Sequence, residues 1–520
     1  MCRADAINHR SEPVGLTSLG GVSVQEELRP AADQRTGVRR FVVGVVLGLA
    51  ILQALWIVTV PPFRASDEID HAYRAASAAR GQWWADVPAD NGRGNLVRVP
   101  ADLVEAAQVQ CEGLSYTGPD NCRPVPGSRS GDSVLVATAA GAYNPAYYWV
   151  VGTVARPFHG ATALYVMRIT SAGLCLLFLG LAAWALLVGS GSGSVAAGWR
   201  GVGLVVALTP VFVFSTVVAA PNGLEMSAAA ALWCALLAAP SAADPRRARR
   251  LVMVAGLAAV IISTLRMLGP LFVLLTVLLV ALFHGRAGLD FVRRTSRPLA
   301  VATLAVAVSV GLSAAWILRT GLAQASKDEL LDRTWSPSTL ILWPLQTIAA
   351  FPFRNVPGPA IVYPVVGLLA GALLFLALKH SRGAQRWALV LAVVSALVLP
   401  IVLTAVTRQA QGVIWQGRYG LPVAIGFVLM AGVILEQHRP GPSRPTVVLI
   451  GALLAVSTAA CLLKIVHDEL GRSASAGDGA WWAAPSWLLV VGSGVAYATL
   501  LSSVMHVRTH KPAEPHVDPT

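Results

Sequence analysis

Residues 41–60 read FVVGVVLGLAILQALWIVTV and contain no charged side chain. A helix rises about 1.5 Å per residue, so a stretch of this length crosses the roughly 30 Å hydrocarbon core of a bilayer. We therefore predict a transmembrane helix here. The stretch is followed at once by PPFRASDEIDH at residues 61–71, which places several charged groups directly outside the membrane.

The composition of the whole chain is that of a multi-pass membrane protein. Of its 520 residues, 55% are hydrophobic and only 13% are charged, and the mean hydropathy is +0.62. Soluble proteins carry about 25% charged residues. The formal net charge of +13 comes mostly from arginines in short loops between apolar runs. Such residues set the orientation of a membrane protein, so we expect a lipid bilayer as a partner and no nucleic acid.

We expect an all-α polytopic membrane protein with about twelve transmembrane helices. The twelve apolar runs lie near 41–60, 163–189, 201–220, 224–240, 251–266, 270–284, 298–318, 359–379, 386–406, 420–436, 446–465 and 484–504. The basic loops fall on one side, so both termini are expected in the cytoplasm, with the protein in a bacterial plasma membrane. Residues 144–158 and 338–352 are expected to form interfacial or re-entrant helices.

This topology divides the chain into a membrane domain and two tails. Residues 1–40 are expected to be a disordered cytoplasmic tail, and residues 506–520 a cytoplasmic C-terminal tail. The membrane domain, residues 41–505, would carry a large first extracytoplasmic loop with juxtamembrane helices. The three substantial outer loops are expected at 61–162, 319–358 and 407–419.

Two of the six cysteines, Cys111 and Cys122, lie in the first outer loop. If that loop faces the oxidising compartment, the two can form a disulfide, which is worth about 3 kcal/mol in the chain-entropy model. We therefore predict a disulfide between them. The cysteines inside apolar runs are expected to be small buried hydrophobic residues.

The first outer loop begins with the densest group of charges. Ser66 can cap a helix that starts at Asp67 and runs to Arg80. On that helix Asp67, His71 and Arg74 share one face, with Glu68 beside them. The alternative is a solvated, well-capped helix, because helix capping alone explains acidic residues at its start.

Two further outer segments carry polar groups to the same membrane face. Asn222 and Glu225 lie where the third and fourth spans meet outside, an expensive place for a charge that faces lipid. Residues 407–419 read TRQAQGVIWQGRY and contain Arg408, Gln416, Arg418 and Tyr419. Guanidinium groups suit phosphate, and the aromatic rings suit sugars or isoprenoid chains. Interfacial anchoring is the alternative for this segment.

An acidic group and an Arg/Gln group at one face fit a lipid-linked phosphate–sugar donor. Asp67 and Glu68 are the candidate catalytic acids, because a carboxylate can deprotonate an acceptor hydroxyl while arginine holds the leaving phosphate. The candidate substrate-binding residues are His71, Arg74, Asn222, Glu225, Arg408, Gln416, Arg418 and Tyr419. No Walker loop, dinucleotide fingerprint or zinc-spaced motif is found. No cofactor is required by these motifs, and a divalent cation, Mg²⁺ or Mn²⁺, stays open, with Asp67, Glu68 and His71 as its ligands.

Several motifs resemble the bacterial membrane-protein family called domain of unknown function 2142. SDEIDHAYRA at 66–75 is similar to P-D-E-x-x-H-x-x-R-A, and QGRYGLP at 416–422 to Q-G-R-Y-L-L-P. The weaker matches are NPAYY at 144–148, similar to P-P-x-Y-Y, and PNG at 221–223, similar to N-P-D-G/A. The chain departs from the family at Ser66, where many members have proline, and after Asn222, where many have aspartate.

That family is similar to the GT-C glycosyltransferases, which include protein mannosyltransferases and aminoarabinose transferases. The resemblance implies a GT-C-like helical fold, an active site at the outer face and a polyprenyl-phosphate-sugar donor. It places the family's acidic pair on Asp67 and Glu68 and its late Gln/Arg motif on Gln416 and Arg418.

The predicted function is therefore a membrane glycosyltransferase acting at the extracytoplasmic face. It would transfer a sugar from a polyprenyl-phosphate donor to a cell-envelope glycan, lipid or protein. A non-catalytic envelope-assembly partner is one alternative, because of the departures at Ser66 and Asn222. A transporter or flippase of lipid-linked intermediates is another, although the centres of the predicted spans hold almost no ionisable groups.

Overall fold

The computed structural model describes residues 23–188, 198–242, 244–321, 335–353, 356–413, 415–476 and 481–505. Within these ranges, ten helices are long and apolar enough to cross a membrane, and two bent helix pairs raise the number to as many as twelve. The ten are α1 (Ser23–Thr59), α6 (Gly160–Val188), α9 (Pro221–Ala238), α10 (Pro245–Leu265), α13 (Ser296–Thr320), α15 (Val362–His380), α16 (Gly383–Gln411), α17 (Leu421–His438), α18 (Arg444–Ala476) and α19 (Ser486–Met505). The prediction of an all-α, multi-pass membrane protein with about twelve spans is confirmed.

The two bent pairs are α7 (Gly198–Ala207) with α8 (Pro210–Val217), at 67°, and α11 (Gly269–His284) with α12 (Arg286–Arg294), at 110°. The third predicted span is therefore a broken helix. Pro210 lacks the N–H that would continue α7, and the Thr209 side chain caps the new helix by accepting from the Phe212 N–H.

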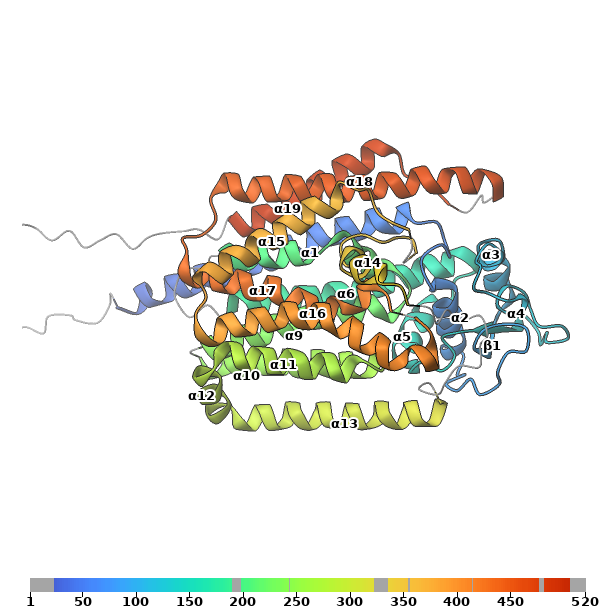
Figure 1. Cartoon of the computed structure of the whole chain (residues 1–520), viewed down its shortest axis with the longest axis horizontal. Coiled ribbons are helices and arrows are strands. Elements are labelled where there is room, and N and C mark those ends of the chain that lie inside the picture. Colours follow the sequence, from blue (N-terminus) through green and yellow to red (C-terminus); the bar gives the residue numbers. More distant parts are fainter. Residues whose placement is uncertain are drawn as a thin grey trace, which may run out of the picture.

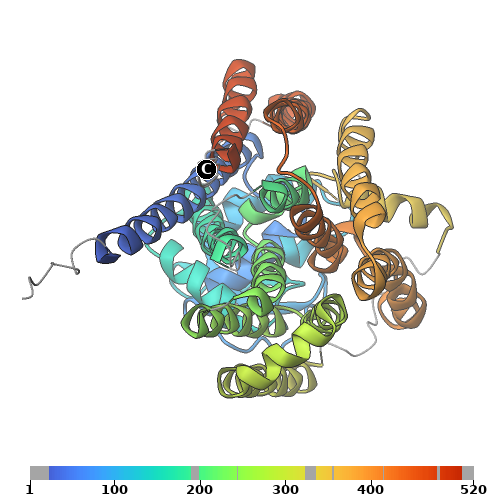
Figure 2. The same cartoon turned by 90° about the vertical axis from the view of Figure 1, so that its left-hand side faces the viewer.

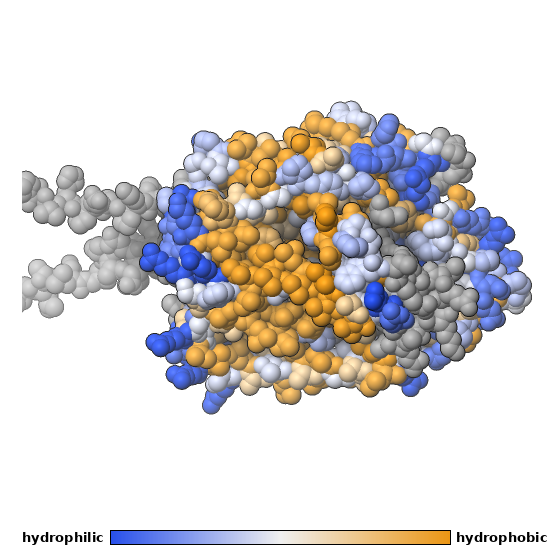
Figure 3. Space-filling view, in the orientation of Figure 1, coloured by the Kyte–Doolittle hydropathy of each residue, from blue (hydrophilic) through white to orange (hydrophobic). Residues whose placement is uncertain are grey.

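The spanning helices run side by side along the long axis, with the start of α1 and the end of α19 at one end of the bundle and the first outer loop at the other (Figure 1). The surface between the two ends is a broad hydrophobic band, and hydrophilic residues gather at both ends (Figure 3). Viewed along the axes, α15 and α16 (gold and orange) stand at the edge of the bundle (Figure 2). This distribution is that of a bundle surrounded by lipid.

The first outer loop folds into a compact α/β layer over the bundle. It comprises α2 (Glu68–Ala78), β1 (Asn95–Pro100), α3 (Ala101–Glu112), α4 (Pro119–Cys122), β2 (Ser133–Thr138) and α5 (Pro145–Ala155). The strands are antiparallel, with Val97 opposite Val136. These two valines, with Val99 and Val134, are buried and cover the underside of the layer.

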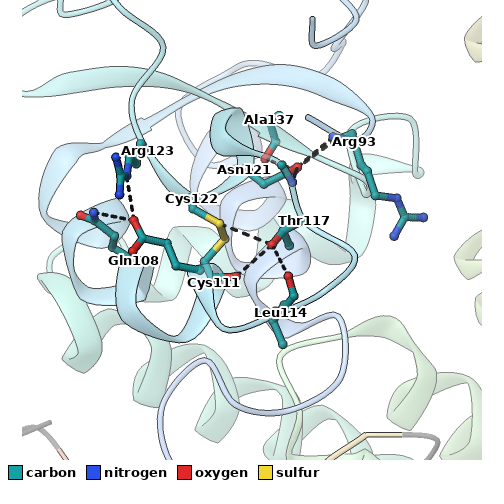
Figure 4. Close-up of a disulfide and its surroundings, with 11 residues drawn as sticks. Arg93, Gln108, Cys111, Leu114, Thr117, Asn121, Cys122, Arg123 and Ala137 are labelled. Atoms are coloured by element: carbon teal, nitrogen blue, oxygen red, sulfur yellow. Dashed lines mark hydrogen bonds and ion pairs between the residues drawn. A yellow bond between two sulfur atoms is a disulfide. The ribbon is translucent and has the colours of Figure 1, made fainter. Parts of the chain in front are cut away.

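Cys111 and Cys122 form a disulfide, the pairing that the sequence predicts, with their Cα atoms 5.3 Å apart. The loop that it closes is held from inside, because the Thr117 hydroxyl donates to the carbonyl oxygens of Cys111 and Leu114 (Figure 4). Asn121 ties the loop to the sheet by donating to the Ala137 carbonyl. The disulfide therefore fixes the position of residues 112–121 above the bundle.

Every residue of α2 is buried, which contradicts the alternative of a solvated juxtamembrane helix. The helix packs against α5, where Gly152 lets the backbones touch: a Cβ at this position would lie 2.0 Å from the Ala75 carbonyl oxygen. Two predicted boundaries were wrong. The helix begins after Asp67 and ends at Ala78 instead of Arg80, and Ser66 donates to the Asp67 side chain instead of capping.

The remaining elements are η1 (Ala239–Ser241), α14 (Ser338–Gln346) and η2 (Gly417–Gly420). The short helices α5 and α14 occupy the two segments that were predicted to be interfacial or re-entrant. Helix α1 begins at Ser23, inside the segment predicted as a tail. The rest of that tail, residues 1–22, and the C-terminal tail 506–520 lie outside the described residues.

Candidate functional site

An ion pair between two segments far apart in sequence marks the centre of the site. Arg418 Nη2 in η2 lies 3.1 Å from Asp67 Oδ2 at the start of α2, and the two side chains are 7% and 35% exposed. The Nε atom of Arg418 is buried without a hydrogen-bond partner in the described part of the chain. The arginine therefore keeps donor capacity for a second anion, while the carboxylate stays accessible.

Asp67 is held in an unusual backbone conformation, with φ of 61°, the left-handed region that non-glycine residues rarely adopt. Such a residue costs on the order of 1 kcal/mol and persists only where its surroundings fix it. Here the Ser66 N–H donates to the Pro352 carbonyl, and the Glu68 N–H to the Ala65 carbonyl. The first and second outer loops thus aim the Asp67 side chain together.

A second ion pair joins the same cluster. Arg266, the residue after α10, lies with Nη1 3.8 Å from Glu225 Oε2 at the start of α9. Its guanidinium carbon is 4.1 Å from the centre of the Tyr419 ring, and that of Arg418 is 5.6 Å from the same ring centre. The two guanidinium groups therefore share one aromatic ring and form a single positive region.

His71 extends the cluster toward the first outer loop. A hydrogen bond of 2.8 Å joins its Nδ1 to the Tyr148 hydroxyl, and its ring centre lies 5.9 Å from that of Tyr143. Burial lowers the pKa of His71 to about 4, although nearby Asp67 acts in the opposite direction. The imidazole is therefore neutral at physiological pH, and it adds no charge to the cluster.

Asp70 holds α2 to the sheet. Its Oδ1 accepts from the Ala139 N–H at 2.6 Å, and its backbone carbonyl accepts from the Thr138 hydroxyl. Burial raises the pKa of Asp70 to about 6, because the hydrogen bond from Ala139 offsets only part of the lost hydration. On the same helix end, Tyr116 from the disulfide-closed loop lies against the backbone of Asp67.

Glu68, a predicted catalytic acid, has a different place. Both of its carboxylate oxygens accept from Arg168, at 2.8 and 2.6 Å, and the two side chains are 0% and 1% exposed. Arg168 also donates to the carbonyls of Val60 and Pro61. Glu68 therefore joins α2 to α6 and the end of α1, and the prediction that it touches substrate is not supported by its geometry.

Arg74 also has a structural role, since it donates to the backbone carbonyl oxygens of Gln82, Trp83 and Tyr143. Arg408 lies in the last turn of α16, half-buried, and belongs to neither ion pair of the cluster. Asn222 is buried in the first turn of α9, three residues before Glu225. Arg74 and Arg408 thus stand apart from the other predicted binding residues.

The predicted metal ligands do not come together. Among the described residues, no group of three His, Cys, Asp or Glu side chains could hold a metal ion. Glu68 is bound to Arg168, which leaves Asp67 and His71 beside two arginines. This donor set does not fit a Mg²⁺ or Mn²⁺ site, which needs several oxygen ligands.

Three of the thirteen buried side-chain polar atoms that lack a hydrogen-bond partner among the described residues belong to this cluster. In the described part of the chain, Glu225 Oε1, Gln416 Oε1 and Arg418 Nε are buried without a hydrogen-bond partner. An unmade hydrogen bond of this kind costs about 1–3 kcal/mol. A polar ligand at the cluster would recover part of that cost.

An apolar cavity of about 320 Å³ adjoins the cluster. Its walls come from α14, α15, α16 and α17, and its lining includes Trp343, Trp415, Gly417 and Gly420. Since Gly417 and Gly420 are the ends of η2, the short helix that carries Arg418 borders the cavity. A single ligand with an apolar chain and an anionic head could contact both.

Sequence reasoning missed Arg266, Tyr143 and Tyr148. Arg266 falls between two apolar runs, and its charge could have been noted as a partner for Glu225 in the next outer turn. The two tyrosines belong to the weakly matching NPAYY segment and its flank, where nothing in the residue pattern indicates a contact with His71.

Comparisons with known proteins agree with the membrane assignment. The family described as "Predicted membrane protein (DUF2142)" matches residues 50–427. Solved structures that are similar include ArnT from Cupriavidus metallidurans bound to undecaprenyl phosphate, at 15% identity and a TM-score of 0.45, over 88% of this chain and 76% of that chain. The same protein in the apo state gives 15% identity, the same coverage and a TM-score of 0.43. No match was found among curated proteins.

Proposed function

We propose that this chain, which belongs to the DUF2142 family of membrane proteins, transfers a sugar from a polyprenyl-phosphate donor to an acceptor hydroxyl. One observation carries the proposal: η2 carries Arg418, which pairs with Asp67, and the two ends of η2 line the 320 Å³ apolar cavity. A donor that joins an isoprenoid chain to a phosphorylated sugar has the same two parts in the same order.

Arg418 and Arg266 would bind the donor phosphate. When the bond between the sugar carbon and the phosphate oxygen breaks, negative charge grows on that phosphate, and two fixed guanidinium groups stabilise it more than they stabilise the intact donor. The unpaired Nε of Arg418 gives one such donor, and the unpaired Oε1 of Gln416 could accept from a sugar hydroxyl. The aromatic ring of Tyr419 contacts both guanidinium groups and would help to hold them at the phosphate.

Asp67 would act as the general base. As the acceptor oxygen forms its bond to the sugar carbon, its proton passes to the Asp67 carboxylate, and the polyprenyl phosphate leaves with the electrons of the broken bond. Asp67 is the exposed member of its ion pair, so an acceptor can reach it. The hydrogen bond between His71 and Tyr148 fixes both side chains. Together they would help to position the acceptor beside Asp67.

The reaction would take place at the membrane face that bears the first outer loop. The basic loops predict that this face is extracytoplasmic, with both termini in the cytoplasm of a bacterial plasma membrane. Cell-envelope glycans, lipids and proteins with free hydroxyls are the acceptors available there. A lipid-linked donor suits this location because it crosses the membrane with its sugar attached.

The test is complementation of a deletion strain with single variants, followed by analysis of its envelope glycans. Asp67→Asn and Arg418→Gln should give the glycan profile of the deletion strain. Both variant proteins should still insert into the membrane and unfold at the wild-type midpoint. The control, Arg98→Gln, changes an exposed arginine on β1 and should restore the wild-type profile. Full complementation by Asp67→Asn would remove the proposed base. Complementation by both variants would favour the non-catalytic assembly partner.

A further inference from the structure

Helix α12 is short and strongly two-sided. In RAGLDFVRR, residues 286–294, the polar positions Arg286, Asp290 and Arg293 recur at helical spacing on one face. Val292 lies on the opposite face and Leu289 between that face and the arginines, and these two apolar side chains are 53% and 62% exposed. Phe291, in contrast, is buried against the bundle. Two large apolar side chains therefore have no protein cover in the described part of the chain.

The orientation of α12 explains this exposure. The helix leaves α11 at 110°, so it runs nearly across the bundle axis where α11 runs along it. The turn is made at Gly285, whose φ of 52° suits glycine. In Figure 1, α12 lies at the end of the bundle that also holds the start of α1 and the end of α19. An amphipathic helix in this position lies in the membrane interface with its apolar face toward acyl chains.

Eight arginines gather around this helix. They are Arg246, Arg247, Arg249 and Arg250 at the start of α10, Arg286, Arg293 and Arg294 on α12, and Arg297 at the start of α13. The segments are in contact, because Arg294 donates to the Pro240 carbonyl of η1, the turn that leads into α10. Asp244 and Asp290 each pair with one arginine, at 3.8 and 3.7 Å. The excess of positive charge is thus much larger than these two acids offset.

We propose that this surface, formed by the start of α10, α12 and the start of α13, binds anionic phospholipids. The lipid phosphate would contact the arginines, and the acyl chains would cover Leu289 and Val292. Anionic headgroups are favoured over zwitterionic ones because the ammonium group of the latter would face the same arginines. The site lies at the opposite end of the bundle from α2, the helix that follows Asp67, so it is independent of the proposed transferase reaction.

The experiment is native mass spectrometry of the full-length protein with equal amounts of phosphatidylglycerol and phosphatidylcholine. Two triple variants lose the same charge: Arg246, Arg249 and Arg286 to Gln at the proposed surface, and Arg98, Arg123 and Arg129 to Gln in the first outer loop. Wild type and the outer-loop variant should retain phosphatidylglycerol preferentially. The α10/α12 variant should retain at least threefold less.

Equal retention by the two variants, or no preference in wild type, would overturn the proposal. If the α10/α12 variant does not fold, the wild-type protein is measured at about 0.05 and 0.5 M salt instead. Screening at high salt should then remove the preference, and a preference that is unchanged by salt would contradict an electrostatic site.

Discussion

Asp67 and Glu68 are chemically similar neighbours, but replacing each acid by its amide should have different effects. We expect the change at Asp67 to abolish activity and the change at Glu68 to destabilise the protein. Glu68→Gln removes the charge that neutralises Arg168, a pair in which both side chains are at most 1% exposed. Breaking a buried pair by removing one partner costs about 3–5 kcal/mol, because the remaining charge stays buried and unpaired. Asp67→Asn breaks a pair whose acid is 35% exposed, so solvent screening limits its cost to about 1 kcal/mol or less.

The measurement is the unfolding midpoint of the purified variants in detergent, by heat and by SDS, beside the glycan profile of complemented cells. We expect Asp67→Asn to unfold close to wild type and to be inactive. Glu68→Gln should unfold much earlier, and its activity should follow the amount of folded protein.

A double-mutant cycle with Arg168→Met provides the control. The double variant should be more stable than Glu68→Gln alone, since it no longer contains an unpaired buried guanidinium. A Glu68→Gln protein that is as stable as Asp67→Asn would refute this reasoning. If it were also inactive, the catalytic role would return to Glu68.

Three further predictions concern other parts of the molecule. Burial lowers the pKa of His71 from 6.5 to about 4, so the neutral ring contributes stability that is complete above pH 6.5 and is lost as the pH falls toward 4, by up to about 3 kcal/mol. His71→Gln should therefore weaken the dependence of the unfolding midpoint on pH over that range. An unchanged pH dependence would contradict this prediction. Replacing Cys111 and Cys122 by serine should destabilise the first outer loop by about 3 kcal/mol, seen as faster proteolysis of that loop while the membrane helices stay protected. Gly367 lines the apolar cavity and has open space around it. Gly367→Phe should therefore leave the unfolding midpoint unchanged but weaken binding of undecaprenyl phosphate severalfold in a titration. Binding as tight as in wild type would show that the donor's isoprenoid chain does not occupy the cavity.

The spanning helices were predictable because each needs only a long apolar run, a property of local sequence. The expected charged face of α2 included Asp67, which the structure pairs with Arg418. The sequence could not separate Asp67 from Glu68, since the difference lies in what each side chain meets. Arg168 lies in the third turn of α6, and its partner is a hundred residues away in sequence.

Arg266 illustrates the opposite problem. Its role depends on Glu225 and Tyr419, which belong to two other outer segments, and no spacing along the chain links the three. The same holds for Ser66, where a good capping residue is present but the following residue adopts a left-handed conformation. Local sequence preferences therefore predicted where the helices lie. The roles of individual polar residues depend on contacts between segments that are distant in sequence.

The pairing of Asp67 with Arg418 also has a consequence for biogenesis. The two residues are 351 positions apart, and a ribosome adds about 5–20 residues per second, so Asp67 exists for roughly 20–70 s before its partner is made. During that time the first outer loop can fold and close its disulfide, but the carboxylate faces no arginine from η2. A nascent chain released before residue 418 would therefore carry the first outer loop and its disulfide but lack the ion pair between Asp67 and Arg418.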